Sequence, residues 1–435
     1  MTPSLAFPLP ERPRLRSLEP RWIEIDGEPR LWLRDPLELG EGVVLVPEAL
    51  VPLLGLLDGG RDHETIGREF ARRTSVSATV AQVRAVLAEL DEALLLDSPR
   101  ARWAGEHALA AYRSAPFRPP ALAGRGYPAQ ADDLDATLAV YRRAWRERGG
   151  GRKALDSALA KGVLSPHIDF RRGGPLYAGT WEQALPAVAE AEVVVLFGTD
   201  HMGGAGRLTP TRQRYATPWG ALDTDVTAVE ALAAAMGDKL AFDEELHHRR
   251  EHSIELASVW LHWALREAGR PTGDVPLVLP ILCGSFFCYL HPELGDDGAA
   301  ALPEDDAILG RALDALASTL EGRRALVVAA ADLAHIGPAF GDPHGLTAPA
   351  REELAARDAA LLRTLTAGDA SAFLEQLRAE HDDRRVCGLP PIYWSMRLLE
   401  RLYGAPPRGT VVGYDQCPAD ADGGSVVTIA GALWR

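Results

Sequence analysis

Three histidines each follow a short apolar segment and have an acidic residue close by: His167 in SPHID, His201 in GTDH and His335 in DLAH. Histidine is the commonest protein ligand for transition metals and the usual general base near neutral pH. A single histidine after a strand is more often a hydrogen-bonded structural residue. Because the carboxyl ends of parallel strands meet at one edge of a sheet, the repetition favours a shared site that binds a metal or transfers protons.

Acidic residues beside these histidines suit a supporting role. Asp169, Asp200 and Asp332 each lie within a few positions of one of them. A carboxylate that accepts a hydrogen bond from one ring nitrogen fixes which nitrogen faces a metal. We therefore expect these three carboxylates to orient the histidine rings.

A further histidine and two acids occur in EHSIE, residues 251–255, at the start of a predicted amphipathic helix. His252 and Glu255 are spaced to share a helix face, and Ser253 lies near the expected N-cap. The segment is not HExxH, so it does not predict a zincin site. Two interpretations stay open: a network that packs the wall of the site, or direct metal ligation.

The four cysteines differ in their surroundings. Cys283 and Cys288 lie in the apolar segment ILCGSFFCYL and are expected in the core, whereas Cys417 lies in a polar loop. Cys387 lies in RRVCGLPPI, a turn just before a predicted helix. A thiol near a helix start can have a lowered pKa, and the thiolate is the form that binds metals. Spacing alone leaves Cys387 either structural or functional.

The elements that must position these residues alternate from about residue 151 onward. Short apolar runs predict strands buried on both faces, and amphipathic segments between them predict helices. We expect an α/β fold with a mostly parallel central sheet covered by helices. The predicted strands lie in ALAKGVLSPHIDF, VVVLFGTDH, PLVLPILCG, ALVVAAADLAH and GGSVVTIAGALW.

Three zones precede this α/β domain, which is expected over residues 151–435. Residues 1–20 are rich in proline and predict a disordered or extended lead-in. Residues 21–100 predict a small α+β domain that begins with a hairpin turning at Asp26–Gly27. Residues 101–150 predict a linker with one helix, and the glycine triplet at its end is the expected domain boundary.

Composition limits the partners. The 435-residue chain has a formal net charge of −15 and no dense basic segment, which argues against nucleic acid or an anionic membrane as a partner. No apolar run reaches the ~18 residues of a spanning helix, and the N-terminus lacks a signal-peptide pattern. Four cysteines in so long a chain do not predict a disulfide framework. We expect a cytoplasmic protein with reduced thiols.

Several segments, taken together, resemble the Memo-like family, also known as AmmeMemoRadiSam system protein B. They follow the family's order over roughly residues 163–433. The resemblance implies the fold of the class III extradiol ring-cleavage dioxygenases, which use non-haem iron. The matching segments are SPHIDFRRGGPLYAG, VVLFGTDHMG, YATPWGALDTD, EHSIEL, LPILCG, VVAAADLAHIG, RRVCGLPPI and GGSVVTIAGAL.

The resemblance also implies roles for individual residues. Memo-like proteins hold iron or copper with two histidines and a cysteine, which match His167, His201 and Cys387. His335 matches a histidine that acts as acid or base in the dioxygenases, and we assign Asp332 to catalysis with it. The residues expected in the pocket or around the ligands are Asp169, Asp200, His252 and Glu255.

Two departures bear on the reaction. Asp169 and Phe170 stand where many relatives have small and glycine residues, which reshapes the pocket mouth. The dioxygenases complete their metal site with a carboxylate, and a thiolate such as that of Cys387 is a softer ligand. The thiolate favours copper or a redox role over ring cleavage.

Residues 21–100 resemble the PqqD-like fold, a winged-helix relative that captures the leader peptides of modified peptides. The resemblance rests on the strand pair, on DGGRDHETIGREF and on a helix that ends in LLLD. It implies peptide binding by addition of a strand at a sheet edge. A generic three-helix cap is the alternative.

Functions of different classes stay open. One is a non-haem iron or copper oxidoreductase that acts on a small molecule or a peptide. Another is a peptide-binding module that kept a dioxygenase-like fold without turnover. A zinc hydrolase is the third, because two histidines and a thiolate can hold zinc with one open position.

Overall fold

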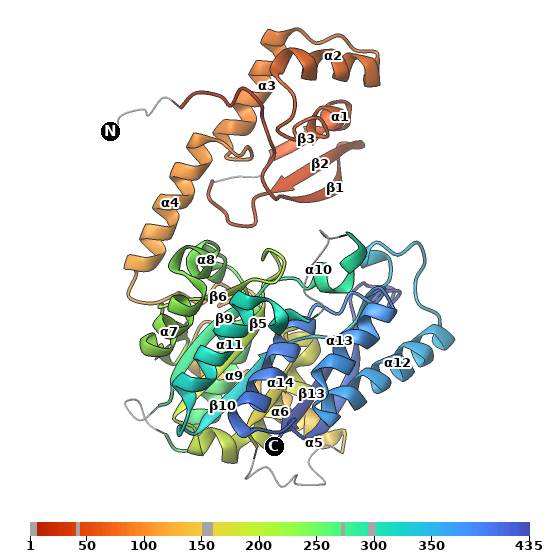
Figure 1. Ribbon diagram of the computed structural model, residues 1–435. Coiled ribbons are helices and arrows are strands. Elements are labelled where there is room, and N and C mark those ends of the chain that lie inside the picture. Colours follow the sequence, from red (N-terminus) through yellow and green to blue (C-terminus); the bar gives the residue numbers. More distant parts are fainter. Residues whose placement is uncertain (1–6, 41–43, 150–159, 271–274, 295–301) are drawn as a thin grey trace. The chain divides into compact units, whose positions relative to one another are not determined.

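The computed structural model describes residues 7–40, 44–149, 160–270, 275–294 and 302–435 (Figure 1). The chain divides into two compact units, Met1–Ala115 and Pro116–Arg435. This division lies inside the segment expected to be a linker, rather than at the glycine triplet near residue 150. The structure of each unit explains why.

Unit 1 is a three-stranded antiparallel sheet packed against helices. The hairpin turn is at Asp26 and Gly27, whose φ angles are 54° and 78°. Two positive φ angles give the turn a twist that matches its strands, which confirms the Asp-Gly prediction. Leu31 and Leu33 pack from the sheet onto a core shared with the helices. The elements are β1 (Glu19–Ile25), β2 (Glu28–Arg34), β3 (Val44–Pro47), η1 (Glu48–Leu50), α1 (Val51–Leu54), α2 (His63–Thr74), α3 (Val80–Glu92) and α4 (Pro99–Ser114).

Of the two alternatives expected for the lead-in, disordered or extended, the described residues 7–20 take the extended form. The N–H of Leu15 donates to the carbonyl of Leu57 over 3.0 Å. The Arg16 guanidinium pairs with Asp35 at 2.9 Å. These bonds hold the segment extended against unit 1, and residues 1–6 lie outside the described part.

Unit 2 is built on an eight-stranded sheet in the order β11-β13-β4-β10-β5-β9-β6, with β12 paired to β13. The four adjacent strands β4, β10, β5 and β9 are parallel. The mostly parallel α/β fold is therefore confirmed. The strands are β4 (Gly162–Ser165), β5 (Val193–Thr199), β6 (Leu208–Pro210), β9 (Leu277–Cys283), β10 (Ala325–Ala330), β11 (His335–Ile336), β12 (Gly409–Pro418) and β13 (Val426–Trp434), with a separate pair β7 (Tyr215–Thr217) and β8 (Gly220–Leu222).

Helices cover both faces of this sheet (Figure 1). Alternate residues of a strand point to opposite faces, so Val195 of β5 joins one core whereas Val194 joins the other. The first core is closed by α7 (Val226–Met236), α11 (Ala307–Leu320), α12 (Ala348–Ala367), α13 (Ala370–Ala379) and α14 (Leu389–Tyr403). The second is closed by α5 (Ala131–Glu147), α6 (Phe170–Glu190) and α9 (Ser253–Glu267).

Short elements occupy the connections of unit 2. They are α8 (Asp238–Phe242), η3 (Glu245–Arg249), α10 (Phe287–Leu290), η4 (Pro292–Leu294), η5 (Pro303–Asp305) and η6 (Pro338–Phe340). Within the described ranges, no helix is both long and apolar enough to cross a bilayer.

Because α5 packs on α6, it belongs to unit 2, which begins at Pro116. A Cβ at Gly179 of α6 would lie 2.2 Å from the Trp145 ring of α5, so glycine is required for this close approach. Arg142 of α5 also pairs with Glu182 of α6 at 2.8 Å. The helix expected in a linker is thus part of the α/β unit, because its apolar face needs the sheet's helical layer for burial.

Candidate metal centre

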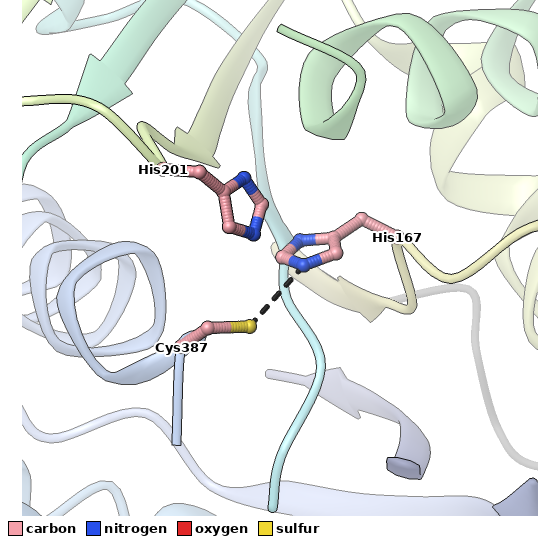
Figure 2. A group of neighbouring side chains, drawn as sticks. All are labelled: His167, His201 and Cys387. Carbon is pink, nitrogen blue, oxygen red and sulfur yellow. Dashed lines mark hydrogen bonds between the residues drawn. The ribbon is translucent and has the colours of Figure 1, made fainter. Parts of the chain in front are cut away.

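Two strand ends and one helix start bring His167, His201 and Cys387 together (Figure 2). His167 and His201 each lie two residues beyond the ends of the parallel strands β4 and β5, and Cys387 lies just before α14. Their ligand atoms all lie within 4.8 Å of one another. The Sγ of Cys387 is 3.3 Å from Nε2 of His167.

The buried ring of His167 is oriented by the backbone. Its Nδ1 lies 2.9 Å from the carbonyl oxygen of Ala330, at the end of the neighbouring strand β10. A carbonyl only accepts, so Nδ1 carries the proton and the lone pair of Nε2 faces Cys387. The tautomer needed for metal binding is therefore set by the fold.

Glu251 orients the ring of His201. One carboxylate oxygen lies 3.0 Å from Nδ1 of His201, and the other lies 3.1 Å from Nδ1 of His252. The two imidazole rings stack with centroids 4.9 Å apart and planes 13° apart. Glu251 also accepts the backbone N–H groups of His201, His252 and Ser253. One buried carboxylate thus holds two imidazoles parallel.

Glu251 was missed as a site residue, although it begins the EHSIE segment. The sequence indicates only a local role for Glu251. An acid directly before a helix can accept hydrogen bonds from the free N–H groups of the first turn. The α9 helix begins at Ser253, directly after His252. The sequence does not indicate that the same carboxylate also reaches His201, fifty positions earlier.

Electrostatics favour a thiolate at Cys387. Burial raises the pKa of this thiol, but His167 and His201 lower it by more, so the net pKa lies below 9.0. Burial likewise raises the pKa of Glu251, and the two imidazoles it binds bring it well below its usual range. Burial lowers the pKa of His201, which Glu251 and Cys387 then raise well above 6.5. The pKa of His167 is lowered by burial.

This donor set fits a first-row transition metal. With metal–nitrogen and metal–sulfur bonds of about 2.0 and 2.3 Å, tetrahedral ligands lie about 3.5 Å apart. The separation of 3.3 Å between Cys387 Sγ and His167 Nε2 is close to this value. Imidazole and thiolate are the ligands of copper, iron and zinc, whereas magnesium and calcium prefer oxygen.

A cavity of ≈ 230 Å³ lies beside the cluster. His201 and Cys387 contribute to its wall. Its apolar lining includes Phe286, Leu290, Val386 and Leu389, and its polar lining includes Asp382 and Arg385. A ligand that enters this cavity therefore reaches the thiolate and one imidazole directly.

His335 does not join the cluster, so the three strand-end histidines are not equivalent. After β10 the chain continues to β11, which pairs with β13, and His335 lies outside the group of three ligand atoms, although His201 is near enough to lower its pKa. Its Nδ1 lies 3.2 Å from the carbonyl oxygen of Leu333 and 3.1 Å from that of Arg385, which leaves Nε2 free of these bonds. Burial lowers the pKa of His335, and Asp332 partly offsets this.

The three predicted carboxylates bind other groups than the rings they were expected to orient. Asp332 accepts the backbone N–H of His167 at 2.8 Å and fixes the loop rather than the ring. Asp200 binds His247 Nδ1 at 2.8 Å. Asp169 caps α6 and pairs with Arg172. Each carboxylate binds donors other than the rings of His167 and His201, and those two rings are oriented by the Ala330 carbonyl and by Glu251.

Glu255 lies in a different network from His252. Its carboxylate accepts hydrogen bonds from the buried Arg118 guanidinium and from the hydroxyl of Tyr127 at 2.6 Å. It also accepts hydrogen bonds from the backbone N–H groups of Ala121 and Leu122. His252 instead lies against His167 and His201, with ring centroids 5.5 and 4.9 Å away. EHSIE was expected either to form a packing network or to ligate a metal directly. Glu255 belongs to a packing network, whereas His252 lies beside the metal cluster.

The chain is similar to known proteins over most of its length. The model of the family described as "Memo-like protein" matches residues 118–285 and 302–433. A MEMO1 family protein of Aquifex aeolicus is 24% identical over 408 residues, which cover 92% of this chain and 95% of the relative. One from Thermus thermophilus is 28% identical and covers 79% of this chain and 92% of the relative. One from Methanosarcina mazei is 25% identical, with 68% and 91% covered.

Proposed function

The chain belongs to the Memo-like family, and from this premise we propose that it is an oxidoreductase that binds iron or copper through His167, His201 and Cys387. One observation carries the proposal: two imidazoles and a thiolate converge within 4.8 Å at the carboxyl edge of the parallel sheet. The rings are oriented by the Ala330 carbonyl and by Glu251. Histidine rings whose orientation is fixed by hydrogen bonds to their second nitrogen are typical of a metal site rather than of chance neighbours.

The thiolate supports a redox role. Its soft sulfur donor, together with two imidazoles, suits copper or iron. When bound, either ion supplies one-electron oxidation and reduction. Within the chain, Glu251 keeps the Nε2 atom of His201 directed at Cys387 by holding its Nδ1 proton.

The cavity favours a small substrate. Its ≈ 230 Å³ is below the ~300–1,000 Å³ typical of drug-sized ligands. The side chains of Phe286 and Leu389 exclude water from part of its wall, while Asp382 and Arg385 offer polar contacts. We infer a small molecule with an apolar body as the substrate class.

His335 is the proposed proton-transfer residue. Two carbonyl oxygens hold its Nδ1 proton, so Nε2 is the atom that accepts or returns a proton. Burial lowers its pKa and keeps the ring neutral near pH 7. Asp332 lies close enough to stabilise the protonated ring, because its charge raises the pKa of His335.

Metal analysis tests the proposal. Full-length protein prepared anaerobically is expected to contain near-stoichiometric iron or copper by mass spectrometry. The variants His167→Ala and Cys387→Ser should lose it, whereas Cys288→Ser should keep it, because that thiol lies outside the cluster. Wild-type protein that takes up neither metal from solution contradicts the proposal, and stoichiometric zinc that is lost in His167→Ala and Cys387→Ser favours a hydrolase.

Oxygen consumption separates turnover from binding alone. Metal-loaded protein is screened with small phenolic and thiol substrates against the His335→Ala variant. Turnover that falls in this variant while the metal stays bound supports the oxidoreductase. Tight ligand binding without oxygen consumption favours the alternative, a binding module.

A further inference from the structure

A second group of metal-ligating side chains lies outside the cluster described above. Ligand atoms of His291, Glu293 and His381 are all within 4.8 Å of one another. Nδ1 of His291 lies 3.4 Å from Oε1 of Glu293. The rings of His291 and His381 stack with centroids 5.9 Å apart and planes 14° apart.

These ligands come from two segments that are distant in sequence. His291 follows α10 and Glu293 lies in η4, whereas His381 follows α13. Arg378 of α13 donates to the carbonyl of Tyr289 in α10 over 2.8 Å, which joins the two segments. The ligands are thus brought together by packing of the fold and not by sequence spacing.

The backbone at His381 is held in an uncommon conformation. Its φ is 51°, in the left-handed region that L residues other than asparagine, aspartate and histidine seldom adopt. Its N–H donates to the carbonyl of Arg378 over 2.9 Å, at the end of α13. This conformation directs the imidazole toward His291 instead of continuing the helix.

We propose that His291, Glu293 and His381 form a second site for a divalent transition metal, with Zn²⁺ as its ion. Two imidazole nitrogens and one carboxylate oxygen are common zinc ligands, and the remaining position takes water. The absence of a thiolate distinguishes it from the cluster at Cys387, where softer ions are favoured. Solvent reaches the site, since the side chains of His291 and Glu293 are 18% and 57% exposed.

Zinc at this site braces the cavity beside Cys387. Leu290 and Asp382, the chain neighbours of His291 and His381, both line that cavity. Asp382 also accepts the N–H of Val386 at 2.9 Å, directly before Cys387. A metal bridge between the two segments therefore links α10 to the turn that carries the thiolate.

Zinc stoichiometry of the full-length protein tests the site. Chelator-treated wild-type protein, dialysed against Zn²⁺, is expected to bind two ions per chain. The double variant His291→Ala/His381→Ala should bind one, and the control His344→Ala, an exposed histidine elsewhere in unit 2, should bind two. The proposal is overturned if the double variant binds as much zinc as wild type.

A variant without the first cluster keeps this test independent of the proposed function. His167→Ala/Cys387→Ser should still bind one zinc ion, and Zn²⁺ should raise its melting temperature. Adding His291→Ala/His381→Ala should abolish the zinc-dependent rise in melting temperature and weaken zinc binding at least tenfold. Failure of His167→Ala/Cys387→Ser to bind zinc while remaining folded overturns the second site, whatever metal the first cluster holds.

Discussion

Two buried glutamates at the start of α9 serve different regions of unit 2. Glu251 binds the side chains of His201 and His252 at the metal centre. Glu255, one helical turn later, binds Arg118 and Tyr127 and ties the segment before α5 to the helix. Both are buried glutamates, one just before α9 and one in its first turn, and their partners distinguish the carboxylate that serves the site from the one that serves the fold. Each of the following variants tests that distinction.

The largest effect is expected from Glu255→Ala. Arg118 and Glu255 are 0% and 1% exposed, so the variant removes the charge of Glu255 from a buried guanidinium. Loss of one partner of a buried pair costs about 3–5 kcal/mol. Denaturant unfolding followed by circular dichroism should show this loss, while the folded fraction still binds metal. The control Glu230→Ala, which breaks an exposed pair with Arg212, should change stability by less than about 1 kcal/mol.

Glu251→Gln should instead weaken metal binding. The amide keeps the shape but cannot hold the protons of two imidazoles as a carboxylate does. Loss of such an orienting partner lowers metal affinity by roughly 10–100-fold. Competition with a chelator measures the change, and Glu255→Gln is its matched control. Unaltered affinity in Glu251→Gln would remove the assignment of this carboxylate to the metal centre.

The reactivity of the thiols gives a pH-dependent test. The pKa of Cys387 lies below 9.0 because His167 and His201 outweigh burial, whereas burial raises that of Cys288. In metal-free protein, Cys387 should therefore react with iodoacetamide before Cys288 near pH 7, with a midpoint of its pH profile below 9.0. Mass spectrometry of the labelled peptides measures both rates. Faster labelling of Cys288 at neutral pH would contradict the inferred electrostatics.

The smallest effect is expected from His252→Ala. This ring stacks on His201 and shares Glu251, but it lies outside the group formed with Cys387. The carboxylate stays bound to His201, so metal affinity should fall by less than about tenfold, a smaller loss than in Glu251→Gln. The same chelator competition measures the ratio of the metal affinities of wild type and variant. A larger loss than in Glu251→Gln would make His252 a ligand.

Local features of the sequence predicted much of the fold. The Asp26–Gly27 turn, the apolar strands β4, β5, β9 and β10 and the helices between them depend on neighbours in the chain. The positions of His167 and His201 after strand ends follow from the same pattern. The PqqD-like resemblance of unit 1, its capture of a peptide and the dioxygenase-like fold stay predictions.

The family resemblance implied His167, His201 and Cys387 as a set, but spacing did not show which side chains meet, and that was decided by tertiary structure. Spacing alone did not distinguish His335 from the other two histidines and left the role of Cys387 open. In the structure His335 lies on β11 outside the group of ligand atoms, and the start of α14 brings the thiol to His167. Tertiary packing also places Glu251 against His201 at the metal centre and Glu255 against Arg118. Periodicity records only which face a residue takes, whereas the partner of a buried charge depends on loops that packing brings from distant parts of the chain.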